Sequence, residues 1–231
     1  MIAICVPSRG LIYSRCMQSV IEGMQALNRI GIETSYHTSH DLPIPDAHNF
    51  CVEQAMQNPA VEKFFMIEDD HYLHPDAFVA LATADTDVTT LQYNDKNGSP
   101  FGILHYNEAG ELLWGGLGST VIKRKVFEGL GIPYFRTDTR YKIVKKYLKD
   151  NKMITEYEQL PNRQEWDTEH NKFVEVKDHW KYGGLDVDFY TRLRKNGYSI
   201  AVLPQYKSHH FQLVKLGEPY TNNGVHEIKQ V

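Results

Sequence analysis

The stretch FMIEDDHYLHPDAF, residues 65–78, places three acidic residues directly after an apolar run. The run predicts a buried strand, in which neighbouring side chains point to opposite faces, so Glu68 and Asp70 are expected to share one side while Asp69 faces the other. Carboxylates a few ångströms apart resist joint ionisation unless a cation or hydrogen-bond donors lie between them. Two carboxylates at i and i+2 suit a hard divalent cation such as Mg2+ or Mn2+, completed by phosphate oxygens.

A solvated acidic loop explains the same residues equally well. Aspartate is a strongly preferred helix N-cap, so Asp69 or Asp70 would cap the helix that is predicted to begin at Pro75. The triplet alone therefore leaves a metal site and a capped helix as alternatives.

The elements that position this triplet alternate between strand and helix over the first 130 residues. Short apolar runs predict strands at residues 2–6, 32–37, 63–67 and 88–93, with amphipathic helices between them. This alternation is typical of a doubly wound α/β sheet, which binds ligands outside the carboxyl ends of its strands. VPSRG follows the first strand and EDD the third, so both segments lie where such a sheet binds its ligand.

The pattern changes after residue 102. GILHYNEAGELLWGG predicts a hairpin around NEAG, and STVI predicts a strand that leads into the helix RKVFEGLG. Residues 136–180 are polar and weakly patterned and are expected to form an insertion, with a helix at residues 140–150. GGLDVDFYTRLRKNGYSIAVLP then predicts a helix followed by an apolar strand.

Composition narrows the class of protein. The 231 residues are 42% hydrophobic and carry a net charge of −4, so the chain has a sizeable core and no general attraction to polyanions. No run reaches the roughly 18 apolar residues of a membrane span, and the N-terminus does not resemble a signal peptide, so a cytoplasmic protein without a membrane anchor is expected. The three cysteines, Cys5, Cys16 and Cys51, are expected to be buried thiols rather than disulfide or zinc partners.

Several stretches, taken in order, resemble nucleotide-sugar-dependent glycosyltransferases of family 2 type with the GT-A fold. FMIEDDHYLHPDAF is similar to their acidic DXD segment, and ICVPSRG to the opening strand and loop that hold the nucleotide base. DAHNFCVEQA resembles a helix that carries an asparagine, here Asn49, with His48 where the family often has arginine. GGLDVDFYTRLRKNGYSI resembles the segment with the catalytic carboxylate, although Leu185 stands where glutamate is usual. SHHFQL follows, where the family often has a metal-binding histidine.

The resemblance covers roughly residues 1–130 and 180–212 and implies a fold class. That class is α/β, with a Rossmann-like GT-A central sheet that is mixed, mostly parallel and flanked by helices, and with the polar insertion near 136–180. It implies one domain over residues 1–231, in which residues 1–100 bind the nucleotide sugar and residues 101–231 form the acceptor half. The small size suggests a minimal bacterial or viral type, located in the host cytoplasm if viral.

The resemblance also implies a Mn2+ or Mg2+ ion on the donor diphosphate. Asp70 would be a ligand, Glu68 a second or water-mediated ligand, and Asp69 would face the ribose. His209 or His210 would complete the metal shell, and only one of them can do so because adjacent strand residues face opposite ways. The other residues implied around the donor are Pro7, Ser8, Arg9 and Asn49.

The family resemblance implies that Asp186 is the general base, which takes the proton from an acceptor hydroxyl in an inverting transfer. The residues by themselves favour another role, because an aspartate at the start of a helix is a natural N-cap and Asp188 would favour the same end of the helix dipole. Both roles for Asp186 therefore stay open.

The donor expected from the resemblance is a UDP-sugar, and the acceptor a glycan or a modified DNA base. One alternative is a sugar-nucleotide nucleotidyltransferase, whose first loop normally reads G-x-G-T-R, unlike VPSRG. Another is a non-catalytic module that binds nucleotide sugar or nucleic acid. The lysines of KIVKKYLK would line a phosphate-rich acceptor or form a solvated helix face; they are Lys142, Lys145, Lys146 and Lys149.

Overall fold

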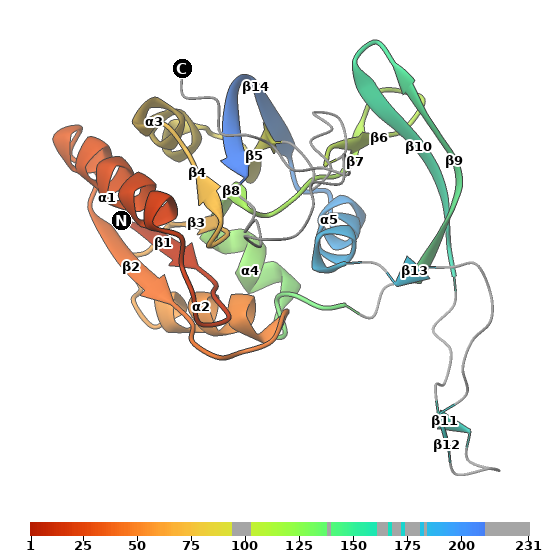
Figure 1. Ribbon diagram of the computed structural model, residues 1–231, viewed down its shortest axis with the longest axis horizontal. Helices are drawn as coiled ribbons and strands as arrows, with labels where there is room; N and C mark the ends of the chain where they lie inside the picture. The colour runs from red at the N-terminus through yellow and green to blue at the C-terminus, as the bar shows by residue number, and fades with distance from the viewer. Residues whose placement is uncertain are drawn as a thin grey trace, which may run out of the picture.

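The computed structural model describes residues 1–93, 103–137, 140–160, 166–167, 172–173, 181–182 and 184–210. Its main sheet has seven strands in the order β2-β1-β3-β8-β5-β14-β4 (Figure 1). β8 and β4 run antiparallel to the other five strands, so the predicted α/β fold with a mixed, mostly parallel sheet is confirmed. The strands are β1 (Ile2–Val6), β2 (Thr34–Thr38), β3 (Lys63–Ile67), β4 (His71–Tyr72), β5 (Val88–Tyr93), β8 (Ser119–Lys123) and β14 (Ile200–His210).

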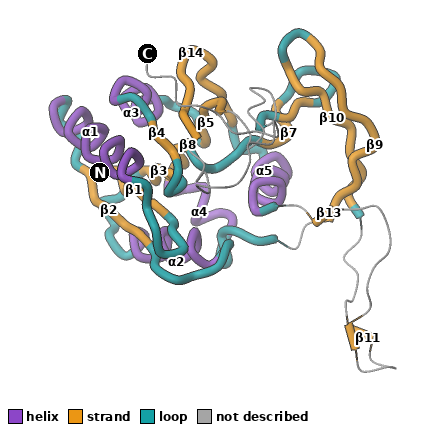
Figure 2. Tube along the Cα trace, in the orientation of Figure 1, coloured by secondary structure: helices purple, strands orange, loops and turns teal. Residues whose placement is uncertain are grey.

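Helices cover both faces of this sheet (Figure 2). Because successive strand residues alternate between faces, Ile4 of β1 packs toward α1 and α3, whereas Ala3 and Cys5 pack toward α2, α4 and α5. All three cysteines are buried and free, as predicted. The helices are α1 (Ser14–Arg29), α2 (Asp46–Met56), α3 (Pro75–Thr83), α4 (Arg124–Leu130) and α5 (Leu185–Lys195). Within the described ranges, none of the helices combines the length and apolarity needed to cross a bilayer.

A second sheet of five strands has the order β13-β9-β10-β6-β7. The predicted hairpin around NEAG is confirmed, because β6 and β7 pair antiparallel across a turn in which the amide of Asn107 donates to the carbonyl of Glu111. The strands are β6 (His105–Tyr106), β7 (Leu112–Trp114), β9 (Arg140–Lys149), β10 (Lys152–Gln159) and β13 (Lys181–Tyr182), while β11 (Trp166–Asp167) and β12 (Lys172–Phe173) pair separately.

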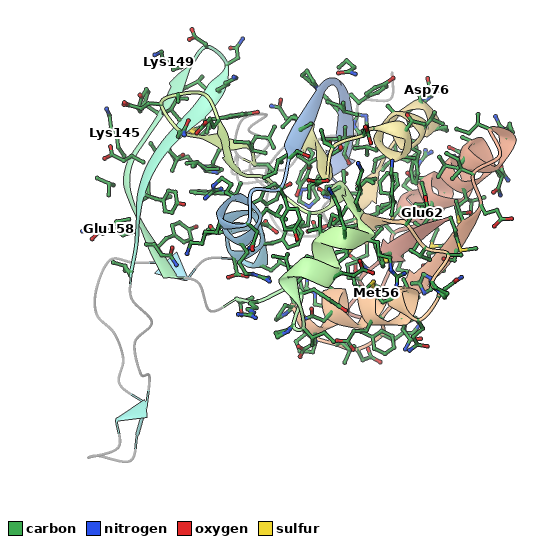
Figure 3. The ribbon with its side chains drawn as sticks, turned by 180° about the vertical axis from the view of Figure 1, so that it is seen from behind. Met56, Glu62, Asp76, Lys145, Lys149 and Glu158 are labelled. Atoms are coloured by element: carbon green, nitrogen blue, oxygen red, sulfur yellow. The ribbon has the colours of Figure 1, made fainter. Side chains whose placement is uncertain are left out.

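The helix expected at residues 140–150 is wrong, since this segment is strand β9, paired antiparallel with β10. The lysines that suggested a helix face stand on an exposed ribbon instead, as Lys145 and Lys149 do in Figure 3. Tyr141 anchors the base of the ribbon, with its ring 5.7 Å from that of Trp114. Aromatic and β-branched residues favour a strand, and cross-strand pairing outweighs the helix propensity of lysine and leucine. Most of the remaining predicted insertion lies outside the described residues.

The carboxyl ends of β1 and β3 lie side by side, because these strands pair in parallel with Cys5 opposite Met66. β2 lies on one side of β1 and β3 on the other. The order in which strands are added to the sheet therefore reverses at β1. Such switch points are the usual place for ligands in open α/β sheets. The loop after β1 and the acidic triplet after β3 therefore meet at one edge.

Candidate active site

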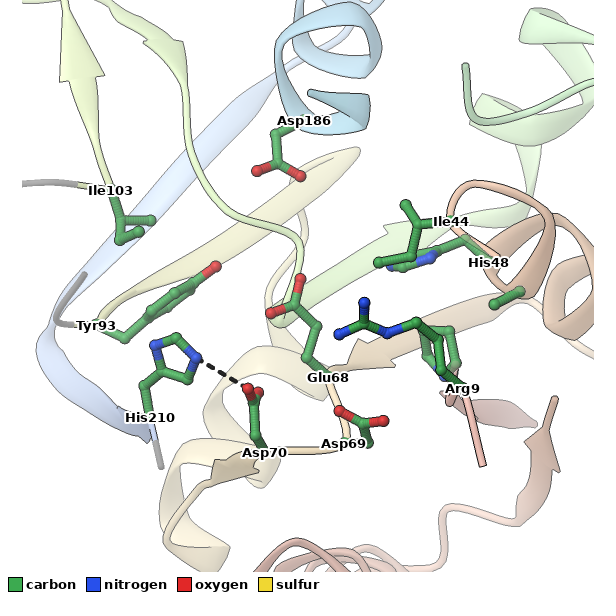
Figure 4. A pocket seen from close by; sticks show the side chains of 12 residues that line it. Arg9, Ile44, His48, Glu68, Asp69, Asp70, Tyr93, Ile103, Asp186 and His210 are labelled. Atoms are coloured by element: carbon green, nitrogen blue, oxygen red, sulfur yellow. Dashed lines mark hydrogen bonds and ion pairs between the residues drawn. The ribbon is translucent and has the colours of Figure 1, made fainter. Parts of the chain in front are cut away.

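A pocket of about 260 Å³ opens at this edge, and Figure 4 shows its lining. Its walls come from the loops after β1 and β3, the end of β5, the first turns of α2 and α5, and the end of β14. The lining residues are Pro7, Arg9, Ile44, Ala47, His48, Glu68, Asp69, Asp70, Tyr93, Ile103, Asp186 and His210. The acidic triplet, the loop residues Pro7 and Arg9, and Asp186 thus reach one pocket, as the sequence predicts.

Three potential metal ligands meet at one side of the pocket. The ligand atoms of Asp70, His71 and His210 all lie within 4.8 Å of one another. Nε2 of His210 is 3.0 Å from Oδ2 of Asp70, while Nε2 of His71 is 3.8 Å from Oδ1 of Asp70 and 3.5 Å from Oε2 of Glu68. The two longer separations are outside the range of hydrogen bonds and suit ligand atoms that share one ion.

Two buried atoms of this cluster lack hydrogen-bond partners within the described part of the chain. Oδ1 of Asp70 and Nε2 of His71 are buried and have no hydrogen-bond partner among the described residues. Buried polar atoms without hydrogen-bond partners are rare in folded proteins, and a bound ion is one of the common explanations. The donor set of carboxylate and imidazole therefore fits a divalent metal.

His71 was not predicted as a site residue. Two serine hydroxyls fix the orientation of its ring. Its ring is fully buried, and its Nδ1 lies 2.9 Å from Oγ of Ser208 and 3.2 Å from Oγ of Ser119. Metal-binding histidines usually have their second ring nitrogen fixed in this way. Antiparallel pairing of β4 with β14 sets His71 opposite His210, and that contact is not visible in the local sequence.

The two candidate histidines of β14 point to opposite sides of the strand, as neighbouring strand residues do. His210 reaches the pocket, whereas His209 is exposed and its ring lies 6.2 Å from that of Tyr72. The structure therefore does not bring His209 to the site, because its neighbour occupies the inward-facing position.

The pKa values of Glu68 and Asp69 shift in opposite directions. Burial would raise the pKa of Glu68, but the close approach of His71 and the nearby rings of His48 and His210 outweigh it and lower that pKa to about 2. Burial raises the pKa of Asp69, with Asp70 and Glu68 adding to the rise and a hydrogen bond from Ser8 opposing it. Glu68 and Asp70 flank His71 while Asp69 faces the β1 loop. The three residues lie in the turn after β3, which ends at Ile67, so the turn and not strand alternation separates them.

Asp186 is the second residue of α5 and points into the pocket toward Glu68 (Figure 4). The helix cap is Gly184, and no side chain caps this end, so the N-cap role is wrong for Asp186. Oδ1 of Asp186 is buried without a hydrogen-bond partner among the described residues. Burial, and next the charge of Glu68, raise its pKa to about 8. A carboxyl group with this pKa can accept or release a proton near neutral pH.

Asp188, the other aspartate of this segment, has a structural contact. Its Oδ2 accepts a hydrogen bond of 2.7 Å from Nε of Arg192, one helical turn further on. Nη2 of Arg192 also donates to the carbonyl of Tyr134. The pair therefore ties α5, which carries Asp186, to the segment that follows α4.

The loop after β1 is shaped by serine hydroxyls. The amide of Ser8 donates to Oγ of Ser39, which donates back to the carbonyl of Ser8, at 2.9 and 3.0 Å. Oγ of Ser8 also donates to the carbonyl of Leu11. Ser8 is buried and supports the loop, while Pro7 and Arg9 line the pocket. Figure 4 shows Arg9 extended over the pocket floor beside Glu68 and Asp69.

Asn49, predicted to contact the donor, does not line the pocket. Its side-chain amide donates to the carbonyl of Phe135 at 3.0 Å and accepts from the amide of Phe135 at 2.9 Å. Both polar ends of the side chain are thereby used to hold a distant loop. The neighbouring His48 lines the pocket instead.

No family model matches this sequence, and no curated protein sequence matches it. Among solved structures, the fold is similar to that of A197 from STIV, with a TM-score of 0.53 and 15% identity over 91% of this chain and 85% of that one. The catalytic domain of Drosophila beta1,4galactosyltransferase 7, in complex with xylobiose, gives a TM-score of 0.48 and 14% identity over 88% of this chain and 64% of that one. A glycosyltransferase involved in the glycosylation of the major capsid of PBCV-1 gives a TM-score of 0.36 and 14% identity over 58% of this chain and 69% of that one.

Likeness at such low identity establishes the fold and leaves the activity open. The seven-stranded mixed sheet with helices on both faces is consistent with the predicted Rossmann-like GT-A fold. The class of protein defined by fold and site is thus an α/β protein with a ligand pocket at the switch point of its sheet.

Proposed function

We propose that the chain is a metal-dependent glycosyltransferase that moves a sugar from a nucleotide-sugar donor, a UDP-sugar, to an acceptor hydroxyl with inversion. The observation that carries the proposal is the composition of one pocket. A cluster of metal ligands around Asp70 and the isolated carboxyl group of Asp186 line the same cavity, with Glu68 between them in Figure 4.

Asp70, His71 and His210 would hold Mn2+ or Mg2+, with Glu68 as a further or water-mediated ligand through its approach to His71. A divalent ion bound there would neutralise the charge that develops on the leaving diphosphate. The cation would also explain how carboxylates can crowd at the rim of a sheet, because it removes their mutual repulsion.

The rest of the donor would extend from this cluster along the loop after β1. Asp69 faces that loop and would accept a hydrogen bond from the ribose, while Pro7 and Arg9 would lie against the nucleotide. The guanidinium of Arg9 can also pair with phosphate oxygens in a fixed planar geometry. Ser8 would support these contacts by holding the loop.

Asp186 would be the general base. As the acceptor oxygen attacks the anomeric carbon, the bond from that carbon to the diphosphate oxygen breaks and the acceptor proton passes to the carboxylate of Asp186. Proton transfer of this kind contributes roughly 100-fold to 10,000-fold to the rate. A pKa of about 8 makes Asp186 a stronger base than an ordinary aspartate once it is ionised.

The pocket also supports the proposed division of one domain into two halves. Residues up to Tyr93 would bind the donor, and residues 101–231 would add Ile103, Asp186 and His210 and contact the acceptor. A glycan or a modified DNA base remains the proposed acceptor.

The test is an assay of nucleotide release from UDP-, GDP-, CMP- and dTDP-sugars with and without Mn2+. We expect one nucleotide class to be consumed, only with metal. Asp70→Asn should abolish donor consumption, and Asp186→Asn should lower transfer steeply while donor binding survives. Asp76→Asn, an exposed carboxylate on α3, is the control and should behave as the unmodified chain.

Two other outcomes would replace the proposal. Consumption of a nucleoside triphosphate together with a sugar phosphate would indicate a nucleotidyltransferase. Nucleotide-sugar binding without turnover, with any acceptor or with water, would indicate a binding module.

A further inference from the structure

His48 is a buried histidine whose ring nitrogens have no partners. It lies in the first turn of α2, is 2% exposed, and its ring meets the ring of Phe135 edge-on at 5.4 Å. Neither Nδ1 nor Nε2 has a hydrogen-bond partner among the described residues, and both atoms are shielded from solvent. Unpaired buried polar atoms cost folding free energy, so this ring has a reason to be there other than packing.

The ring is uncharged. Burial lowers the pKa of His48 to about 4, although the charge of Glu68 opposes the shift. A neutral imidazole offers one N–H donor and one bare nitrogen acceptor. Such a group can pair with neutral polar groups and adds no charge attraction for a phosphate.

The surroundings of His48 differ from those of the metal cluster. The other residues of this end of the pocket include the apolar side chains of Pro7, Ile44 and Ala47. In Figure 4, His48 and Ile44 lie together on the side of Glu68 away from His210. The guanidinium of Arg9 also reaches this side of the pocket in Figure 4. A mostly apolar wall with a few hydrogen-bonding groups is the usual lining for a small organic ligand such as a flat heterocycle.

We propose that His48 forms a hydrogen bond with the polar edge of the donor's nucleobase and thereby sets which nucleotide the pocket accepts. This inference rests on the proposed function, because it assumes a nucleoside diphosphate whose phosphates lie at Asp70. It adds a specificity-determining residue at the other end of the pocket. Discrimination by a buried hydrogen-bonding group is strong because a base with the wrong edge leaves that group unpaired.

A structural role and a ligand-binding role for His48 predict different results for an apolar replacement. If the ring only fills space against Phe135, an apolar replacement of similar size should leave nucleotide preference unchanged. If the ring is kept for a ligand, the unliganded protein should melt no lower when the two unpaired polar atoms are replaced by the side chain of leucine.

The experiment compares the unmodified chain with His48→Leu, His48→Asn and His48→Gln. Affinities for UDP, GDP, CDP and ADP are measured by calorimetry with saturating Mn2+, and Mn2+ binding is measured alone. Asn places polar atoms near the position of Nδ1 and Gln near that of Nε2, so these variants report which nitrogen is used. All variants should bind Mn2+ alike, since His48 is not among the clustered ligands.

We expect the unmodified chain to prefer one base and His48→Leu to lose about tenfold of that preference, which is what one neutral hydrogen bond contributes. At least one of the Asn and Gln variants should retain it. An unchanged preference in His48→Leu overturns this inference and leaves the transferase proposal standing. Failure of the unmodified chain to bind any of the four nucleotides with Mn2+ overturns both.

Discussion

Nε2 of His210 lies 3.0 Å from Oδ2 of Asp70, although 140 residues separate them in the chain. The contact joins the end of β14 to the loop after β3, and it is made beside the buried ring of His71. The cluster contains one carboxylate and two imidazoles from segments that are distant in the sequence. It therefore exists only in the folded chain.

The two adjacent histidines of β14 provide a matched pair. His210→Ala should weaken Mn2+ binding by about tenfold or more, because even the loss of an outer partner costs roughly 10–100-fold. His209→Ala should leave Mn2+ affinity unchanged, since that side chain is exposed. Calorimetric titration of each variant measures the effect. Equal affinities in the two variants would remove His210 from the metal site.

Ser208→Ala tests the contact that orients His71. Its hydroxyl is 2.9 Å from Nδ1 of His71, so its loss should lower Mn2+ affinity by roughly 10–100-fold while the fold persists. Ser35→Ala is the control, because Ser35 makes a contact of the same length to His37 away from the pocket. If both serine variants bind Mn2+ as the unmodified chain does, the Ser208 hydroxyl does not position His71 for metal binding.

Asp186→Asn should change the dependence of stability on pH. An unfolded aspartate has a pKa near 3.9, whereas burial and Glu68 raise that of folded Asp186 to about 8. Between these values the folded chain binds a proton that the unfolded chain has lost, so stability falls as pH rises from about 4 to 8. The amide has no such dependence.

Thermal melting of both forms in the presence of a chelator, from pH 5 to pH 9, measures this difference. The variant should melt close to the unmodified chain at pH 5 and several degrees above it at pH 9, at about 2–4 °C for each kcal/mol. A constant offset at every pH would mean that Asp186 is ionised in the folded protein throughout.

Asn49→Ala tests the structural role that the contacts give this residue. Two buried hydrogen bonds to the backbone of Phe135 would be lost, which should lower the free energy of unfolding by about 1–3 kcal/mol. Mn2+ affinity of the folded variant should be unchanged. Urea unfolding and titration measure the two quantities. Normal stability with weakened metal or donor binding would return Asn49 to the pocket.

The sequence was informative wherever the chemistry follows from local periodicity. Strand alternation predicted that only one of the two histidines on β14 could reach the site, although the sequence did not say which. The same argument failed for its stated reason at Glu68, Asp69 and Asp70, because these residues lie in a turn after β3. The pocket at the ends of β1 and β3 followed from the alternation of strands and helices, because parallel strands place their carboxyl ends at one edge.

Three further predictions missed the structure because they depend on contacts between distant segments. His71 directly follows the triplet, yet its role depends on Ser208, which is 137 residues away. Asn49 is committed to Phe135, 86 residues away. Residues 140–149 form a strand because β10 pairs with them, although their lysines and leucine suit a helix. None of these partners is visible in a local pattern.

The central claim is that Asp70, His71 and His210 bind one divalent cation beneath a donor diphosphate. A crystal grown with Mn2+ and UDP tests it directly through the anomalous signal of manganese. We expect a single strong peak about 2.0–2.3 Å from one atom of each of the three side chains, with phosphate oxygens completing the shell. Nucleotide density at this rim without a manganese peak, or a peak elsewhere, would contradict the claim.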